Sequence, residues 1–211
     1  MRIFGLKMYC EPLTCRKSNQ FLADKFHIKR EDKYEKLLSE GRVCGLERYF
    51  KYCAWDEDLS KETKVYVIKT YFTKEIVCFF ALKAGIVSSD FKRQDIEREK
   101  NALINGTKLV PSTIAGIELS HFAVNDNYRE RHNGVKGLGE YIYPKFIYPI
   151  IEKTSSLIGS KIVYLYAADD SSKKLTNYYE TLHFSTIKDV DDLKPVSSYY
   201  DDNCVFMFKL L

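Results

Sequence analysis

The residues with the clearest chemical meaning form a basic, glycine-containing turn in the second half of the chain. An apolar run from Ile114 to Val124 predicts a strand, and a polar stretch then leads to Gly134, Gly137 and Gly139. The apolar pattern after these glycines predicts a helix. Main-chain N–H groups at a helix start lack partners within the helix and carry partial positive charge, and glycines let an anion approach them. The turn is therefore a candidate phosphate-binding site, with a tight loop that binds nothing as the alternative interpretation.

Two better-known phosphate-binding motifs do not fit this turn. A Walker loop requires Gly-Lys-Ser/Thr, which does not follow the glycines. A dinucleotide fingerprint stands near the start of a βαβ unit, with an acidic residue that ends the next strand. Here Asp169 and Asp170 lie past the next predicted strand, and a predicted hairpin and helices precede the turn.

Two motifs resemble those of the GNAT superfamily of acetyl-CoA-dependent N-acetyltransferases. The first reads Phe122-Ala123-Val124 at a strand end and then, after a polar turn, Gly134-Val135-Lys136-Gly137-Leu138-Gly139. The second reads Tyr179-Glu180-Thr181-Leu182-His183-Phe184, which is similar to the family's Tyr-Glu-x-x-Gly-Phe. The resemblance covers about residues 44–211. A looser similarity to the acetyltransferase toxins of toxin–antitoxin pairs lies in Cys53-Ala54, Val77-Cys78-Phe79-Phe80 and Val110-Pro111-Ser112.

The resemblance implies that acetyl-CoA is the co-substrate and that the first motif binds it. The strand end would hold the pantetheine through main-chain hydrogen bonds, and the pyrophosphate would lie on the N–H groups of the turn. Basic side chains beside the turn would add positive charge. The residues implied in binding are Phe122, Ala123, Val124, Arg129, Arg131, Gly134, Val135, Lys136, Gly137, Leu138, Gly139 and Glu140. No metal site is expected.

Acetyl transfer to an amine needs a group that protonates the leaving thiolate and a group that deprotonates the amine. The resemblance implies Tyr179 as the general acid, and only Tyr179, not its neighbour Tyr178, has a phenylalanine five residues later. Glu118 lies where histone-type members of the family carry a general base. His121 or a water molecule is an alternative base. Core packing for Tyr179 and a cross-sheet ion pair for Glu118 are the structural alternatives.

Two positions depart from the family pattern. Gly134 stands where the family has arginine or glutamine, which removes a side chain but keeps the main-chain donors. His183 replaces the glycine of Gly-Phe, and we expect this to alter the turn after the tyrosine helix.

The order of the expected helices and strands that must position these residues predicts a mixed α/β domain. Apolar spacing predicts helices over 18–27, 34–38, 45–55, 89–103, 138–157 and 172–182, and strands over 64–72, 76–82, 114–124, 162–167, 183–188 and 204–210. Residues 125–136 are expected to form a polar loop. Pro144 and Pro149 predict a bent helix or two joined pieces, and Gly159 should end it. The expected fold is α/β, a single mixed, mostly antiparallel twisted sheet flanked by helices, as in GNAT-like acyl-CoA N-acyltransferases.

The chain has 211 residues, a net charge of +4 and six cysteines, and this composition predicts one globular domain. Residues 1–211 are expected to form one GNAT-like domain, with residues 1–43 as a less well-matched N-terminal helical addition. No membrane span and no export signal are predicted, so we expect a cytoplasmic protein with reduced, uninvolved thiols.

The predicted function is acetyl transfer from acetyl-CoA to a primary amine of an unidentified small molecule, protein or tRNA. The alternatives are a catalytically silent acyl-CoA-binding interaction module and a toxin-type aminoacyl-tRNA acetyltransferase. The small positive net charge gives little support to a nucleic-acid ligand. It does not exclude tRNA as the molecule that carries the acceptor amine. We expect the protein to have no membrane partner, and a homodimer is compatible with these expectations.

Overall fold

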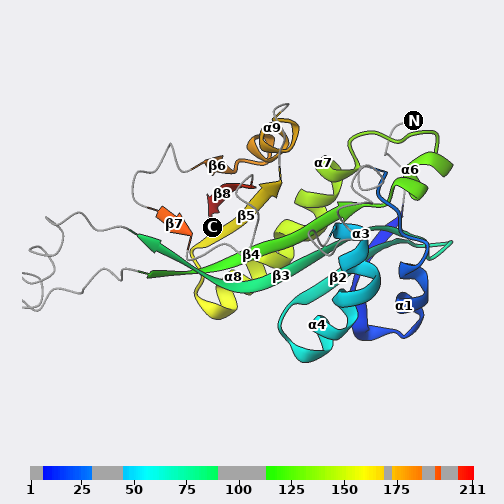
Figure 1. Ribbon diagram of the computed structural model, residues 1–211, viewed down its shortest axis with the longest axis horizontal. Coiled ribbons are helices and arrows are strands. Elements are labelled where there is room, and N and C mark those ends of the chain that lie inside the picture. The colour runs from blue at the N-terminus through cyan, green and yellow to red at the C-terminus, as the bar shows by residue number, and fades with distance from the viewer. Residues whose placement is uncertain (1–6, 30–44, 90–112, 169–172, 187–192, 196–203) are drawn as a thin grey trace, which may run out of the picture. The chain divides into compact units, whose positions relative to one another are not determined.

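A computed structural model describes residues 7–29, 45–89, 113–168, 173–186, 193–195 and 204–211 (Figure 1). The described strands belong to one mixed sheet in the order β1-β2-β3-β4-β5-β8-β6, with β7 paired to β3. Strands β4 and β5 pair in parallel, whereas the pairs β1/β2, β2/β3, β3/β7, β5/β8 and β6/β8 are antiparallel. The predicted fold class, a mixed and mostly antiparallel sheet flanked by helices, is confirmed.

The contacts divide the chain into two compact units. Unit 1 comprises Met1–Lys83 and Leu119–Ile150, and unit 2 comprises Ala84–Glu118 and Ile151–Leu211. Three elements contribute residues to both units: β3 (Ile76–Ser89), β4 (Thr113–Val124) and α8 (Tyr148–Ile158).

Unit 1 is built on an antiparallel hairpin of β2 (Lys64–Thr70) and β3, flanked by β1 (Met8–Pro12). β-branched and aromatic residues fill these strands, as their preference for half-buried pleated surface requires. Two groups of helical elements bring their apolar side chains to one face of the hairpin. The first consists of the 3₁₀ turn η1 (Leu13–Cys15) and the helix α1 (Ser18–Ala23). The second is a continuous helical run of α3 (Leu46–Arg48), the π turn η3 (Tyr49–Cys53) and α4 (Ala54–Ser60).

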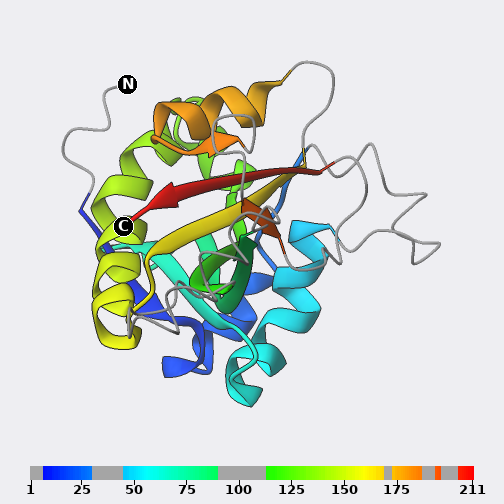
Figure 2. The same cartoon turned by 90° about the vertical axis from the view of Figure 1, so that its left-hand side faces the viewer.

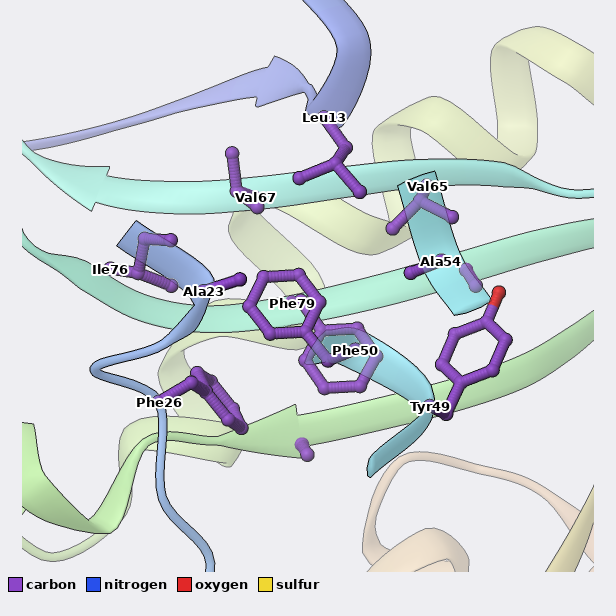
Figure 3. Packing of buried hydrophobic residues seen from close by; sticks show 12 residues of the cluster. Leu13, Ala23, Phe26, Tyr49, Phe50, Ala54, Val65, Val67, Ile76 and Phe79 are labelled. Carbon is purple, nitrogen blue, oxygen red and sulfur yellow. The ribbon is translucent and has the colours of Figure 1, made fainter. Parts of the chain in front are cut away.

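The core of unit 1 is aromatic (Figure 3). The ring of Phe50 stacks on Phe79 with centroids 4.3 Å apart, and Phe26 meets Phe50 edge-on at 4.9 Å. Each of these buried side chains contributes about 1.5–3 kcal/mol to the free energy of unfolding. Aliphatic residues of the strands and helices complete the cluster: Leu13, Ala23, Ala54, Val65, Val67, Ile76, Ala81 and Ala123.

Also in unit 1, the helix α6 (Asp126–Arg131) and the helix α7 (Leu138–Ile142) follow β4. The prediction of a plain polar loop over 125–136 is wrong here, because the side chain of Asn125 caps α6 at its start. The sequence predicted a bent helix or two joined pieces, and the structure has joined pieces. A π turn, η4 (Tyr143–Ile147), which contains Pro144, separates α7 from α8. The wider turn accommodates a residue that has no N–H to donate.

Unit 2 contains β5 (Ile162–Ala168) and β8 (Cys204–Leu210), which lie side by side in Figure 2 with the helix α9 (Lys174–Thr181) nearby. Its core consists of Val87, Ile162, Tyr164, Phe206 and Phe208. Strand β6, described at Ser185–Thr186, begins two residues later than predicted, and the short strand β7 (Leu193–Pro195) was not predicted. At Gly159 the helix α8 ends with a positive φ of 71°, as expected.

Several predicted features lie outside the described residues. These are the helix over 34–38, residues 90–103 of the next predicted helix and the Val110-Pro111-Ser112 similarity.

Candidate functional site

The end of β4 is held by the side chain of Asn125, which is 1% exposed. Its Nδ2 donates to the carbonyl oxygen of Ile76 at 2.9 Å, and its Oδ1 accepts from the N–H groups of His27 at 3.2 Å and Asn127 at 3.1 Å. The main-chain N–H of Asn125 also donates to the carbonyl of Val77 at 2.8 Å. One amide side chain therefore ties the strand end to β3, to the segment after α1 and to the start of α6.

The strand-end residues Phe122, Ala123 and Val124 lie directly before this anchor. Ala123 is buried in the unit 1 core, while Phe122 and Val124, the alternate residues, are half-buried. The alternation expected of a strand is therefore present where the first motif begins.

The glycine turn takes left-handed backbone conformations at the positions where glycines stand. Gly134 has a φ of 65° and Gly137 a φ of 72°, and Asn133 joins them with a φ of 56°. The N–H of Gly134 donates to the carbonyl of Arg129 at 2.8 Å, which folds the turn back on the end of α6. A Cβ added to Gly134 would meet no atom within 4 Å, so the space beside this residue is open.

The turn leads directly into α7, whose first helical residues are Leu138, Gly139 and Glu140. Across the start of the helix, the N–H of Tyr141 donates to the carbonyl of Gly137 at 3.1 Å. The earlier N–H groups, from Val135 to Glu140, are those that a helix start leaves for a ligand or water. Val135 and Leu138 anchor the turn because both are buried. This arrangement can accept an anion on the main chain.

The basic side chains near the turn differ in how they are engaged. Arg129 pairs with Asp126, with 2.9 Å between Nη1 and Oδ1, and Arg131 pairs with Glu75. Both guanidinium groups are thus partly neutralised within unit 1. Lys136 is exposed and forms no ion pair within the described part of the chain. Of the three predicted cations, Lys136 has the charge most open to a ligand.

In unit 2 the second motif forms the end of the helix α9 and the hydrogen-bonded turn that follows it. Tyr179 lies in the last turn of α9, and its carbonyl accepts from the N–H groups of Leu182 at 3.0 Å and Phe184 at 3.1 Å. The rings of Tyr179 and Phe184 meet at 5.7 Å. The five-residue spacing of the motif is therefore the length of the turn that brings the phenylalanine back onto the tyrosine.

His183 adopts a φ of 67°, the conformation that glycine takes most easily. The chain therefore forms a left-handed turn at this position with histidine in place of glycine. The side chain of His183 is exposed, so the turn accommodates it without packing.

Tyr179 is 8% exposed, and burial raises the pKa of its hydroxyl above the usual value for tyrosine. The group is therefore protonated at neutral pH and can donate a proton or a hydrogen bond.

Glu118 is half-buried on β4, and Oε2 accepts a hydrogen bond from the Tyr164 hydroxyl at 3.3 Å. Sequence reasoning considered a cation across the sheet as the structural partner of Glu118. The partner identified here is a tyrosine on the adjacent parallel strand.

The alternative base, His121, lies in unit 1 with its ring stacked on Tyr49 at 3.6 Å. Burial lowers the pKa of His121 to about 4, so the imidazole is neutral at pH 7. Its Nδ1 lies 3.1 Å from the Ser120 hydroxyl.

The described cysteines, Cys10, Cys15, Cys53, Cys78 and Cys204, are free thiols. Burial raises the pKa of Cys10 to about 12 and that of Cys78 well above its usual range. A thiol with a raised pKa has little nucleophilic thiolate at neutral pH. Among the described residues, no group of three or more His, Cys, Asp or Glu side chains is arranged to hold a metal ion. No described helix has the length and apolar character needed to cross a membrane.

Sequence reasoning missed two residues that organise the site regions, Asn125 and Tyr164. Asn125 carried a signal, because an asparagine directly after a strand and before a polar segment is a common N-cap. Tyr164 carried none, since its partner is 46 residues away in the sequence.

No protein family profile and no curated protein sequence match the chain. Solved structures do. AtaTR bound with acetyl-CoA superposes with a TM-score of 0.65 at 12% identity over 97% of this chain and 94% of that chain. A tyrosine-to-phenylalanine mutant of KacT superposes with a TM-score of 0.61 at 11% identity, over 97% of this chain and 95% of that chain. AtaT complexed with acetyl-methionyl-tRNA superposes with a TM-score of 0.54 at 11% identity, over 95% of this chain and 94% of that chain. At these identities the matches establish the fold, which is the GNAT-like fold that the motifs resemble.

Proposed function

We propose that the chain is an acetyltransferase that moves an acetyl group from acetyl-CoA to a primary amine. The observation that carries the proposal is the left-handed glycine turn at Gly134 and Gly137, which follows the anchored end of β4 and opens α7. Among the similar structures, AtaTR was solved with acetyl-CoA bound.

The turn fits a pyrophosphate by its own geometry. The space beside Gly134 is open, the N–H groups from Val135 to Glu140 stand at a helix start, and Lys136 is exposed. Phe122, Ala123 and Val124 would offer main-chain groups to the pantetheine. Arg129 and Arg131 would contribute at longer range, because each is already paired with a carboxylate.

Acetyl-CoA supplies an activated thioester when it is bound. Tyr179 would act as the general acid, since its hydroxyl is protonated at neutral pH and can donate to the sulfur that leaves.

Glu118 would accept the proton of the attacking amine. A half-buried carboxylate with an oriented oxygen suits this role. His121 would also be neutral at pH 7, but its low pKa of about 4 makes it a weak base.

A tRNA-linked amine is a second acceptor class within this proposal. It is favoured by the similarity to AtaT, which was solved in complex with acetyl-methionyl-tRNA. A small-molecule or protein amine is the alternative acceptor. We place the reaction in the cytoplasm, and a homodimer or an antitoxin complex would be compatible with it.

The first test is binding and turnover. Acetyl-CoA should raise the melting temperature, because it binds the folded state only. A panel of amines and aminoacyl-tRNAs should include an acceptor that releases free thiol from acetyl-CoA. A raised melting temperature with no release from any acceptor would favour the silent binding module, and no rise at millimolar acetyl-CoA would contradict the proposal.

The second test is Tyr179→Phe. We expect kcat to fall about 100-fold with little change in the Kd of acetyl-CoA, because general acid catalysis contributes factors of this size. Tyr178→Phe is the matched control, since it removes a hydroxyl from the next residue of α9. Equal rates in the two variants would remove Tyr179 from the mechanism.

A further inference from the structure

We propose that Tyr164 is a positioning residue that holds the Glu118 carboxylate in the orientation it needs to accept a proton. This inference rests on the proposed function, and in particular on Glu118 as the base.

The contact joins directly paired residues of two parallel strands. Glu118 on β4 and Tyr164 on β5 are register partners, and the Tyr164 hydroxyl donates to Oε2 of Glu118 at 3.3 Å. Both residues belong to unit 2. The hydrogen bond therefore forms within one compact unit and depends on the register of one strand pair.

Two glycines on neighbouring strands make room for the tyrosine. A Cβ at Gly85 on β3 would lie 1.8 Å from the Tyr164 hydroxyl oxygen. A Cβ at Gly116 on β4 would lie 2.9 Å from Cε1 of the ring. These separations are too short for real atoms, so the ring occupies space that only glycine leaves free. At Gly85 the space is occupied by the hydroxyl itself, the atom that reaches Glu118.

The rest of the ring is fixed by packing. Tyr164 is 4% exposed, and its ring lies 5.6 Å from that of Phe206 and 6.1 Å from that of Tyr166. A side chain held this tightly has a single rotamer, so its hydroxyl keeps one place relative to Glu118. A fixed donor lowers the number of orientations that the Glu118 carboxylate samples, so its free oxygen is held in one position for accepting the proton.

The protonation state of Tyr164 suits a permanent donor. Burial, with a further contribution from the Glu118 charge, raises the pKa of Tyr164 far above neutral. The charge of Glu118 acts on the hydroxyls of both Tyr164 and Tyr166 on β5, and Cys204 on β8 also acts on Tyr166. The tyrosines remain uncharged near pH 7, so the contact is a hydroxyl donating to a carboxylate.

The direct test compares kcat and the Kd of acetyl-CoA in Tyr164→Phe with those of the unmodified protein. The variant keeps the ring and removes the donor, so the Glu118 carboxylate loses the contact that orients it. We expect kcat to fall about tenfold and the Kd of acetyl-CoA to stay unchanged. Tyr66→Phe is the control, because Tyr66 is also a strand tyrosine, half-buried and stacked on Phe80 in unit 1.

A second variant tests the same contact from the other side. In Gly85→Ala both Tyr164 and Glu118 remain, but the new methyl group displaces the hydroxyl, so kcat should fall as in Tyr164→Phe. A double-mutant cycle with Glu118→Gln then separates positioning from a general structural effect. If Tyr164 acts through Glu118, Tyr164→Phe has no further effect on rate in the Glu118→Gln background.

The outcomes separate the two proposals. Absence of acetyl transfer by the unmodified protein would contradict the proposed function. Transfer with a kcat that Tyr164→Phe and Gly85→Ala leave unchanged, or rate losses that multiply with Glu118→Gln, would overturn the role of Tyr164 alone. Melting temperatures show which variants fold, and either Tyr164→Phe or Gly85→Ala suffices if the other does not.

Discussion

The two compact units offer different kinds of chemistry. In unit 1 the candidate binding groups belong to the main chain: a strand end anchored by Asn125 and a glycine turn that opens a helix. In unit 2 the candidate catalytic groups are side chains, with Tyr179 held by packing and Glu118 by a hydrogen bond. The difference teaches where substitutions should act. Changes in backbone geometry in unit 1 should weaken binding, and loss of single functional groups in unit 2 should slow turnover.

The largest effect should come from Asn125→Ala in unit 1. The substitution leaves the Ile76 carbonyl and the N–H groups of His27 and Asn127 without their partner. Each buried polar group left unsatisfied costs about 1–3 kcal/mol, so we expect the free energy of unfolding to fall by about 3 kcal/mol. Urea denaturation measures this loss. The control is Asn127→Ala, which removes an exposed bond to the Lys25 carbonyl and should cost less than about 1 kcal/mol.

A smaller effect should separate stability from binding at the glycine turn. Gly134→Ala places an L-residue at a φ of 65°, which costs about 1–2 kcal/mol, but its Cβ meets no atom within 4 Å. The methyl group would occupy the open space where we propose that the pyrophosphate binds. We expect the Kd of acetyl-CoA to rise about tenfold, measured by calorimetry.

Gly159→Ala is the matched control for this prediction. Gly159 has a φ of 71°, and a Cβ there also meets no atom within 4 Å, but the residue ends α8 far along the chain from the turn. It should lose the same stability and keep the affinity for acetyl-CoA. Equal affinity in the two variants would contradict binding at Gly134.

The smallest effect should appear at the left-handed turn of unit 2. His183→Gly relieves a non-glycine residue at a φ of 67°, so we expect the protein to gain up to about 1 kcal/mol with kcat and KM unchanged. Thermal unfolding measures the gain. His183→Ala should show no gain, because alanine meets the same backbone strain. A fall in kcat for His183→Gly would show that the imidazole, and not only the turn, serves the reaction.

The sequence by itself predicted the features that depend on neighbours along the chain. The hairpin over 64–82 followed from β-branched and aromatic runs around a polar break, and the bent helix after Gly137 followed from prolines inside an apolar pattern. The glycine turn and the tyrosine motif were located because their spacing is local: a turn, a helix start or a helix end is decided by residues a few positions apart.

Only the tertiary structure decided the contacts between distant segments. The side chain of Asn125 forms hydrogen bonds with His27 and Ile76, which lie 98 and 49 positions earlier in the sequence. The hydroxyl of Tyr164 donates to Glu118, which lies 46 positions earlier. Such pairs depend on strand register, and a shift of one residue would turn every side chain of the strand to the other face of the sheet. The sequence determined which residue types were available, and the register decided that the hydroxyl of Tyr164 lies where it can donate to the Glu118 carboxylate, at 3.3 Å.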